Sequence, residues 1–172
     1  MTALPRIRIV LATASFALLA ACGGEKAAEP DQAGTDATAV ASGDEPAVIK
    51  ERQDNYEAIG DAFKAIRGQM ESGSPDFAAI GNSAADINER AKRIPTYFPE
   101  GTGVDAGYDT EALATIWEKP AEFQTAAQNL VDASAELSGV AVTGDASAVG
   151  EAVKKLGGTC KACHDQFRVK KN

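Results

Sequence analysis

The chain has 172 residues and a formal net charge of −8 at pH 7. This length allows about one globular domain, and the acidic balance disfavours nucleic acid as a partner, because nucleic-acid binding requires clustered lysine and arginine. Alanine is abundant and aromatic residues make up only 6% of the chain, a composition that favours helices over sheets.

The N-terminal segment has the features of an export signal. Arg6 and Arg8 precede an uncharged, mostly apolar run, Ile9 to Ala21, that is too short to span a bilayer as a helix. The run ends in Leu-Ala-Ala-Cys, which resembles a bacterial lipobox, so we expect residues 1–22 to form a lipoprotein-type signal peptide ending at a lipidated Cys22. Ordinary signal cleavage is the alternative, and it would leave an unpaired thiol in an oxidising compartment.

The expected location is therefore the periplasmic side of a membrane, with the lipid as the only membrane contact; a soluble periplasmic protein is the alternative. Residues 23–46 contain six acidic residues, one lysine and no aromatic residue. Such a segment buries too little apolar surface to offset the entropy of ordering. We expect it to be a disordered acidic tether.

From residue 47 onward, apolar residues recur at alternating spacings of three and four, which predicts amphipathic helices, and the alternation typical of strands is not sustained. The first predicted helix covers residues 47–70. The second begins with Ser74 as its cap and Pro75 in its first position, and it ends at Ile94 because Pro95 follows.

Residues 95–109 contain two prolines and three glycines and predict a long loop whose aromatic residues cover an apolar surface. The third helix is expected over residues 113–137, where Pro120 either kinks it or marks the start of its long part. The fourth is expected over residues 149–167. Four amphipathic helices joined by short connections predict an all-α, antiparallel four-helix bundle over residues 47–172.

The segment Cys160-Lys161-Ala162-Cys163-His164 carries the clearest chemical signal. Attachment of a c-type haem requires two thiols that add to its vinyl groups and an imidazole that reaches the iron, and C-x-x-C-H supplies all three. On a helix, Cys163 and His164 lie three and four residues after Cys160 and share its face. We therefore expect one covalent haem c, bound through both cysteines, with His164 as axial ligand of the iron.

Other uses of this motif fit less well. A structural zinc site takes four protein ligands, and beyond the motif the chain offers no other histidine and only Cys22. A dithiol oxidoreductase places C-x-x-C at the start of a helix in a βαβ unit, whereas this motif lies late in a predicted helix. A Ser-His-Asp triad is not available once the single histidine binds iron, so we expect that the protein is not an enzyme.

Two parts of the chain together resemble the cytochrome c prime (cytochrome c′) family, the class II c-type cytochromes. The first is Arg52-Gln53-Asp54-Asn55-Tyr56 early in the first predicted helix, and the second is the haem motif followed by Phe167 and Arg168. The resemblance covers most of residues 47–172. It implies a four-helix bundle with covalently bound haem.

The resemblance also implies that Tyr56 stands over the distal face of the haem. Family members with methionine there have six-coordinate iron and transfer electrons. Tyrosine at this position implies five-coordinate, high-spin iron that binds small gaseous ligands such as NO or CO. The alternative is that Tyr56 is only an aromatic residue of the core. A small-ligand-binding haem protein is thus the first hypothesis, and a periplasmic electron-transfer cytochrome is the alternative.

Arg52 occupies an apolar stripe and is expected to pair with a charge, for which a haem propionate is the nearest anion; the alternative is a surface arginine that extends to solvent. By the resemblance, Gln53 bonds the same propionate region. Arg168 is expected to tune His164 and the iron, or else to be a cation favoured at a helix C-terminus. Two more residues are expected at the haem edge: Thr110 and Glu111.

Two surfaces are candidates for protein partners. Residues 151–172 hold six basic and two acidic residues and could steer an acidic redox partner toward the haem; a solvated helix face is the more frequent meaning of such a run. The apolar stripes of the first two predicted helices are a candidate homodimer interface.

Overall fold

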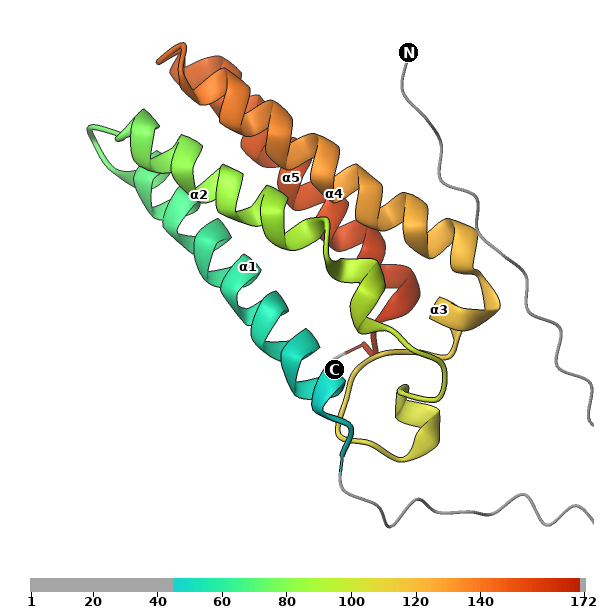
Figure 1. The fold of residues 1–172 in the computed structure, drawn as a ribbon. Helices are drawn as coiled ribbons and strands as arrows, with labels where there is room; N and C mark the ends of the chain where they lie inside the picture. Colours follow the sequence, from blue (N-terminus) through green and yellow to red (C-terminus); the bar gives the residue numbers. More distant parts are fainter. Residues whose placement is uncertain (1–44, 171–172) are drawn as a thin grey trace, which may run out of the picture. The chain divides into compact units, whose positions relative to one another are not determined.

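Four long helices run antiparallel to one another in the computed structural model, which describes residues 45–170 (Figure 1). The described residues contain no β-strand, which confirms the predicted all-α, four-helix architecture. The long helices are α1 (Ala47–Glu71), α2 (Phe77–Ala91), α4 (Pro120–Ala141) and α5 (Ala146–Phe167). Between α2 and α4 lie two 3₁₀ turns, η1 (Ile94–Tyr97) and η2 (Val104–Ala106), and the one-turn helix α3 (Thr115–Glu118).

The described residues 45–170 belong to one compact unit. The predicted signal peptide, Cys22 and residues 23–44 of the predicted tether lie outside them. Among residues 45–170, no helix combines the length and the apolar character needed to cross a bilayer.

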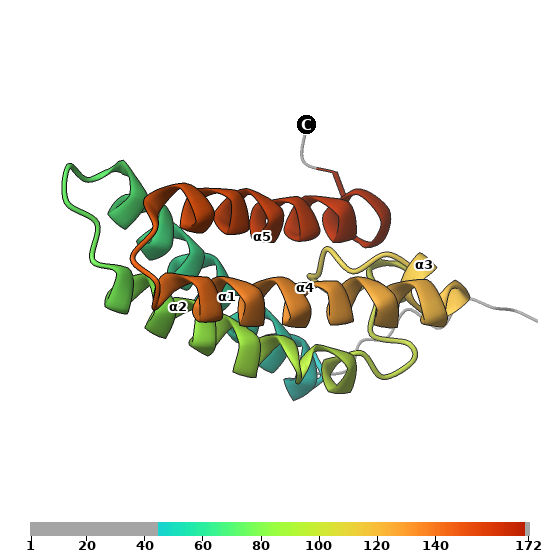
Figure 2. The same ribbon diagram turned by 90° about the horizontal axis from the view of Figure 1, so that it is seen from above.

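The long helices pack in chain order, α1 against α2, α2 against α4, and α4 against α5. Each turns its apolar stripe inward, and the largest fully buried apolar side chains come from all four helices: Ile49, Ile66, Ile80, Ile87, Leu137, Val149 and Leu156. By contrast, α1 and α5 make few contacts with each other. In Figure 2 they diverge toward the end of the bundle at which α5 finishes.

The boundaries of α2 differ from the prediction at both ends. Asp76, not Ser74, is the N-cap, and its carboxylate accepts a hydrogen bond of 3.0 Å from the backbone N–H of Ala79. Aspartate caps a helix as well as serine does, so the motif alone did not decide between them. At the other end α2 finishes at Ala91, and Pro95 lies in the first turn of η1, where its missing N–H leaves no bond unmade.

Pro120 is the first residue of α4, so it starts the long helix rather than kinking it. This helix continues to Ala141, four residues beyond the predicted end. Gly144 turns the chain with a positive φ of 68°, a conformation that glycine adopts without strain. Asp145 then caps α5 by accepting hydrogen bonds from two backbone N–H groups.

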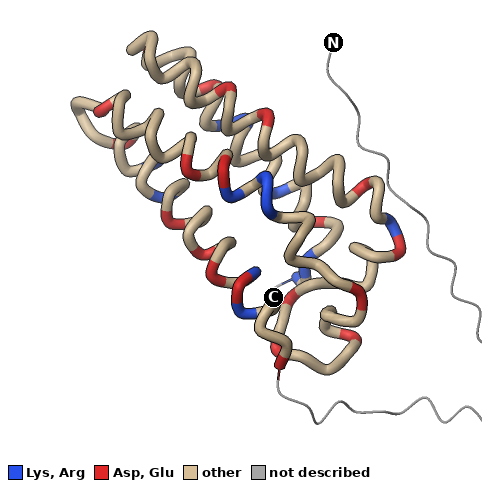
Figure 3. Tube along the Cα trace, viewed as in Figure 1, with Lys and Arg blue, Asp and Glu red and all other residues tan. Residues whose placement is uncertain are grey.

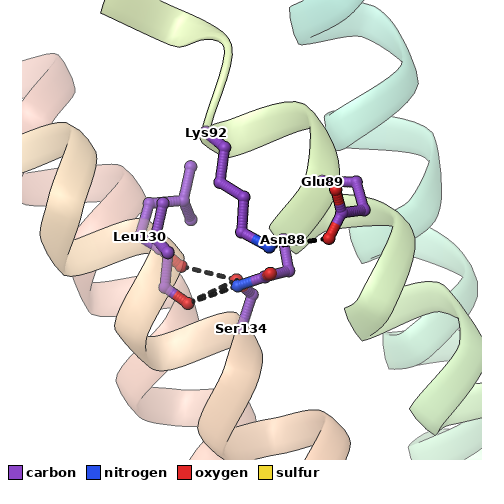
Figure 4. A network of polar contacts seen from close by, with 6 residues as sticks. Asn88, Glu89, Lys92, Leu130 and Ser134 are labelled. Carbon is purple, nitrogen blue, oxygen red and sulfur yellow. Dashed lines mark hydrogen bonds and ion pairs between the residues drawn. The ribbon is translucent and has the colours of Figure 1, made fainter. Parts of the chain in front are cut away.

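A buried polar contact joins α2 to α4 (Figure 4). The Asn88 amide donates to the backbone oxygen of Val131 at 2.7 Å and to the Ser134 hydroxyl at 3.1 Å. Ser134 is fully buried, and its hydroxyl donates to the backbone oxygen of Leu130 at 2.7 Å. Because the Asn88 amide donates to two acceptors on α4, this contact can fix the register of the two helices.

We expect Ser134→Ala to lower the free energy of unfolding by about 1–2 kcal/mol, because it removes the fully buried Ser134 hydroxyl that accepts from the Asn88 amide. Urea denaturation measures this change. Thr125→Ala is the matched control, since the exposed Thr125 hydroxyl makes the same bond to the residue four positions earlier, Ala121. Equal effects of the two substitutions would contradict a role in helix pairing.

Candidate functional site

A cavity of about 600 Å³ lies between the diverging parts of α1 and α5. Most of its surface is apolar, and its size is in the range of sites for small molecules and cofactors. Its walls come from α1, from the loop before α3, from α4 and from α5. The cavity wall includes all nine predicted site residues that the structure describes: Arg52, Gln53, Tyr56, Thr110, Glu111, Cys160, Cys163, His164 and Arg168.

The α5 wall carries the motif residues. Cys160 and Cys163 are free, half-buried thiols that pack against the core, as their place on the apolar stripe predicts. Burial raises the pKa of both thiols, that of Cys163 to about 11. Desolvation and the nearby Arg168 lower the pKa of His164. A lowered pKa favours the neutral imidazole, which is the form that binds a metal.

The α1 wall of the cavity presents the Tyr56 ring and, one helical turn later, the open space beside Gly60. Burial raises the pKa of the Tyr56 phenol, which stays neutral, and its ring meets that of Phe98 edge-on with centroids 6.3 Å apart. Gly60 also lines the cavity, and beyond the neighbouring backbone of its own helix no atom lies within 4 Å of where its Cβ would be. A larger residue at Gly60 would therefore fill part of the cavity.

Arg52 enters the protein instead of extending to solvent, so the surface alternative is wrong: its exposed fraction is 3%. Its guanidinium donates to the backbone oxygen of Thr102 at 2.8 Å, to the Thr102 hydroxyl at 3.2 Å and to the Thr110 hydroxyl at 2.8 Å. It also lies 4.6 Å from the centroid of the Phe98 ring. All of these acceptors are neutral oxygens, so a buried cation lines the cavity with neutral hydrogen-bond partners. Burial lowers its pKa.

Gln53 joins the same loop from a more exposed position, where its amide donates to the backbone oxygen of Asp109 at 2.8 Å. The chain next to this point runs beside the end of α5. The backbone N–H of Val169 donates to the backbone oxygen of Glu111 at 2.9 Å, and that of Leu113 donates to the backbone oxygen of Phe167 at 3.1 Å. The Glu111 carboxylate also forms an ion pair with Arg168. These contacts explain why Thr110, Glu111 and Arg168 share the cavity wall.

Aromatic rings close one end of the cavity. Phe98 packs against Trp117 and Phe123, with centroids 6.4 Å and 4.8 Å away, and Phe123 packs against Phe167 at 5.3 Å. The Trp117 indole also donates to the backbone oxygen of Phe98 at 3.0 Å. The expectation that aromatic residues of the long loop cover an apolar surface is met by Phe98.

These residues fit a c-type haem. The α5 wall supplies two free thiols one helical turn apart and a neutral imidazole, which are the groups that attachment and axial ligation require. The opposite wall leaves open the volume beside Gly60, and the mostly apolar lining suits a large apolar ring. The buried Arg52 cation offers a site for a carboxylate.

The basic run near the C-terminus is largely neutralised. Four of its bases form ion pairs, which are Lys154–Glu151, Lys155–Glu136, Lys161–Asp165 and Arg168–Glu111. Figure 3 shows both signs of charge distributed over the helices. This pairing weakens the case for a basic docking surface around the haem motif.

Three residues of the site were not expected from the sequence. Thr102 accepts two of the Arg52 bonds, but it lies in a loop without any pattern that marks it. Gly60 and Phe63 line the cavity from α1. A glycine inside a helix destabilises it by about 1 kcal/mol relative to alanine. The glycine at position 60 of a predicted helix was therefore a sequence signal for a site at which a side chain is not accommodated.

Comparison with known proteins gives a consistent result. The family model described as cytochrome C′ matches residues 47–168. The cytochrome c′ of Pararhodospirillum photometricum is 37% identical over 122 residues, which cover 71% of this chain and 96% of that protein.

Solved structures are similar as well. The cytochrome c′ of Rhodobacter spheriodes superposes with a TM-score of 0.67 at 32% identity, covering 75% of this chain and 100% of the other. The nitric oxide complex of a variant cytochrome c prime from Alcaligenes xylosoxidans superposes with a TM-score of 0.61 at 27% identity, covering 73% and 95%.

Proposed function

Because the chain belongs to the cytochrome c′ family, whose members carry one covalently bound haem c, we propose that it binds small diatomic ligands such as NO or CO at a five-coordinate, high-spin iron. One observation carries this proposal. The wall across from His164 presents Tyr56, and neither a second histidine nor a methionine or lysine lines the cavity. The one methionine among the described residues, Met70, lies near Gly150 at the other end of α5.

The haem supplies redox change and ligand binding, and the chain holds and screens it. Cys160 and Cys163 would attach it covalently, and the imidazole of His164 would ligate the iron. Arg52 and Gln53 would hold a propionate in the region where α1 meets the loop. Arg168, which already lowers the pKa of His164, would tune the basicity of the axial ligand.

Tyr56 controls access. Its phenol is neutral and half-buried, and its ring packs on Phe98, so it blocks the distal side without offering a charged ligand. A ligand that enters past Tyr56 would require this ring to move. Small neutral gases need the smallest displacement.

The test is the visible spectrum of the ferric and ferrous holoprotein, followed by titration with NO. We expect high-spin spectra and uptake of NO by the ferrous protein. A low-spin, six-coordinate spectrum or failure to bind NO would overturn the proposal and favour the alternative, a periplasmic electron-transfer cytochrome.

Replacing Tyr56 by alanine is expected to accelerate CO association by roughly tenfold, equivalent to removing about 1.4 kcal/mol of barrier, because no ring then has to move. Flash photolysis of the ferrous CO complex measures the rate. Tyr97→Ala is the control, since Tyr97 does not line the cavity. If Tyr56→Ala leaves the rate unchanged, Tyr56 is a packing residue only.

Proteins of this family are periplasmic. We infer further that residues 1–22 direct export, that Cys22 carries a lipid, and that residues 23–46 tether the bundle to the membrane. The proposed ligand binding involves no catalytic reaction, so we also propose that the protein is not an enzyme. A redox partner protein and a second copy of the chain remain predicted partners.

A further inference from the structure

Two side chains of α1 lie directly over glycines of α5. A Cβ placed on Gly157 would lie 3.2 Å from Cζ and 3.7 Å from Cε1 of Phe63, and a Cβ on Gly150 would lie 3.8 Å from Cε of Met70. The absence of a side chain at Gly157 therefore lets the Phe63 ring approach the α5 backbone. This contact lies where α1 and α5 come together, beside the cavity that Phe63 also lines.

The spacing of these contacts follows the helix repeat. Phe63 and Met70 are seven residues apart on α1, and Gly150 and Gly157 are seven apart on α5. One further step of seven leads back to Tyr56 on α1 and forward to His164 on α5. Since α1 and α5 are antiparallel and seven residues make about two turns, the glycine contacts align Tyr56 with His164 across the cavity.

The Phe63 contact is tight. At 3.2 Å an added Cβ is closer than ordinary van der Waals contact, so a methyl group at Gly157 displaces the ring by a few tenths of an ångström. Phe63 lines the same cavity as Gly60 and Tyr56. A displacement away from α5 therefore changes the space beside these two residues.

We propose that Phe63, packed on Gly157, is a positioning residue that sets the separation of α1 and α5 and with it the size of the ligand that the distal site admits. This inference rests on the proposed ligand-binding function. It assigns ligand selection to a contact two helical turns away from the axial ligand.

Gly157→Ala and its neighbour Gly158→Ala form the test. Both substitutions raise helix propensity equally, but Gly158 is exposed and nothing lies within 4 Å of its Cβ position. We expect Gly157→Ala to slow CO association with the ferrous holoprotein by roughly fivefold, equivalent to about 1 kcal/mol of added barrier. Gly158→Ala is expected to leave the rate unchanged.

A rescue variant separates spacing from general damage. Phe63→Leu shortens the side chain and is expected to return the Gly157→Ala rate toward the wild-type value. Urea denaturation gives an independent readout, in which Gly157→Ala destabilises relative to Gly158→Ala and this difference shrinks in the Phe63→Leu background.

The outcomes are distinguishable. If the wild-type ferrous protein does not take up CO, the proposed function and this inference both fail. If the wild type binds CO and the two alanine variants have equal rates, or if Phe63→Leu does not rescue Gly157→Ala, only this inference fails.

Discussion

Replacing Cys160 and Cys163 together by alanine is expected to abolish covalent attachment of haem. These are the only two thiols among the described residues, and both face the cavity beside His164. Without thioether bonds the haem is held by the axial ligand and apolar contacts alone. Mass spectrometry and haem staining of the denatured chain should then show the polypeptide without haem.

Two controls define this result. Each single alanine variant keeps one thioether bond and is expected to retain haem after denaturation. Ala162→Ser changes the interior of the motif at an exposed position and leaves both thiols and the imidazole in place, so full attachment is expected. Haem that remains bound to the denatured double variant would refute the assigned attachment site.

The second large effect is expected at Arg52. Arg52→Met keeps most of the side-chain volume but leaves the buried oxygens of Thr102 without their donor. We expect the free energy of unfolding of the holoprotein to fall by about 2–4 kcal/mol, since unsatisfied buried polar groups are costly. Urea denaturation monitored by circular dichroism measures the loss.

Arg67→Met is the matched control for Arg52→Met. Arg67 lies on the same helix, but its guanidinium is exposed and pairs with Glu71 at the surface. A change within about 0.5 kcal/mol is expected for such a surface position. A similar loss for both variants would show that burial of the guanidinium contributes nothing special.

Periodicity predicted the four helices because each must bury one apolar stripe, and burial of those stripes dominates the packing. It did not predict their ends, where several polar residues compete. Asp76 displaced Ser74 as cap, and the sequence did not decide between them because aspartate and serine side chains both accept backbone N–H bonds at a helix start. The place of Pro120 was open for a similar reason, since proline suits a first turn as well as a kink.

The site followed from the sequence only where local chemistry is distinctive. Cys160, Cys163 and His164 form a motif that can be recognised without a fold. Arg52 was marked by a charge on an apolar stripe, but its partners were not predictable. They lie 50 and 58 residues away in a loop, and only the folded chain brings them together.

The fit of Phe63 on Gly157 was beyond sequence reasoning for a different reason. It depends on how closely two helices approach, which residue spacing does not determine. A glycine on a helix surface and a glycine under a ring look the same in the sequence, as Gly158 and Gly157 show.

Two of the helices that line the cavity, α1 and α5, are far apart in the sequence. The groups proposed to attach and ligate the haem lie on α5, whereas Tyr56, Gly60 and Phe63 lie on α1, about a hundred residues earlier. Substitutions on α1 can therefore change which gas enters while maturation of the haem protein proceeds as before. Descendants of one ancestral bundle could in this way diverge in ligand preference through a single helix.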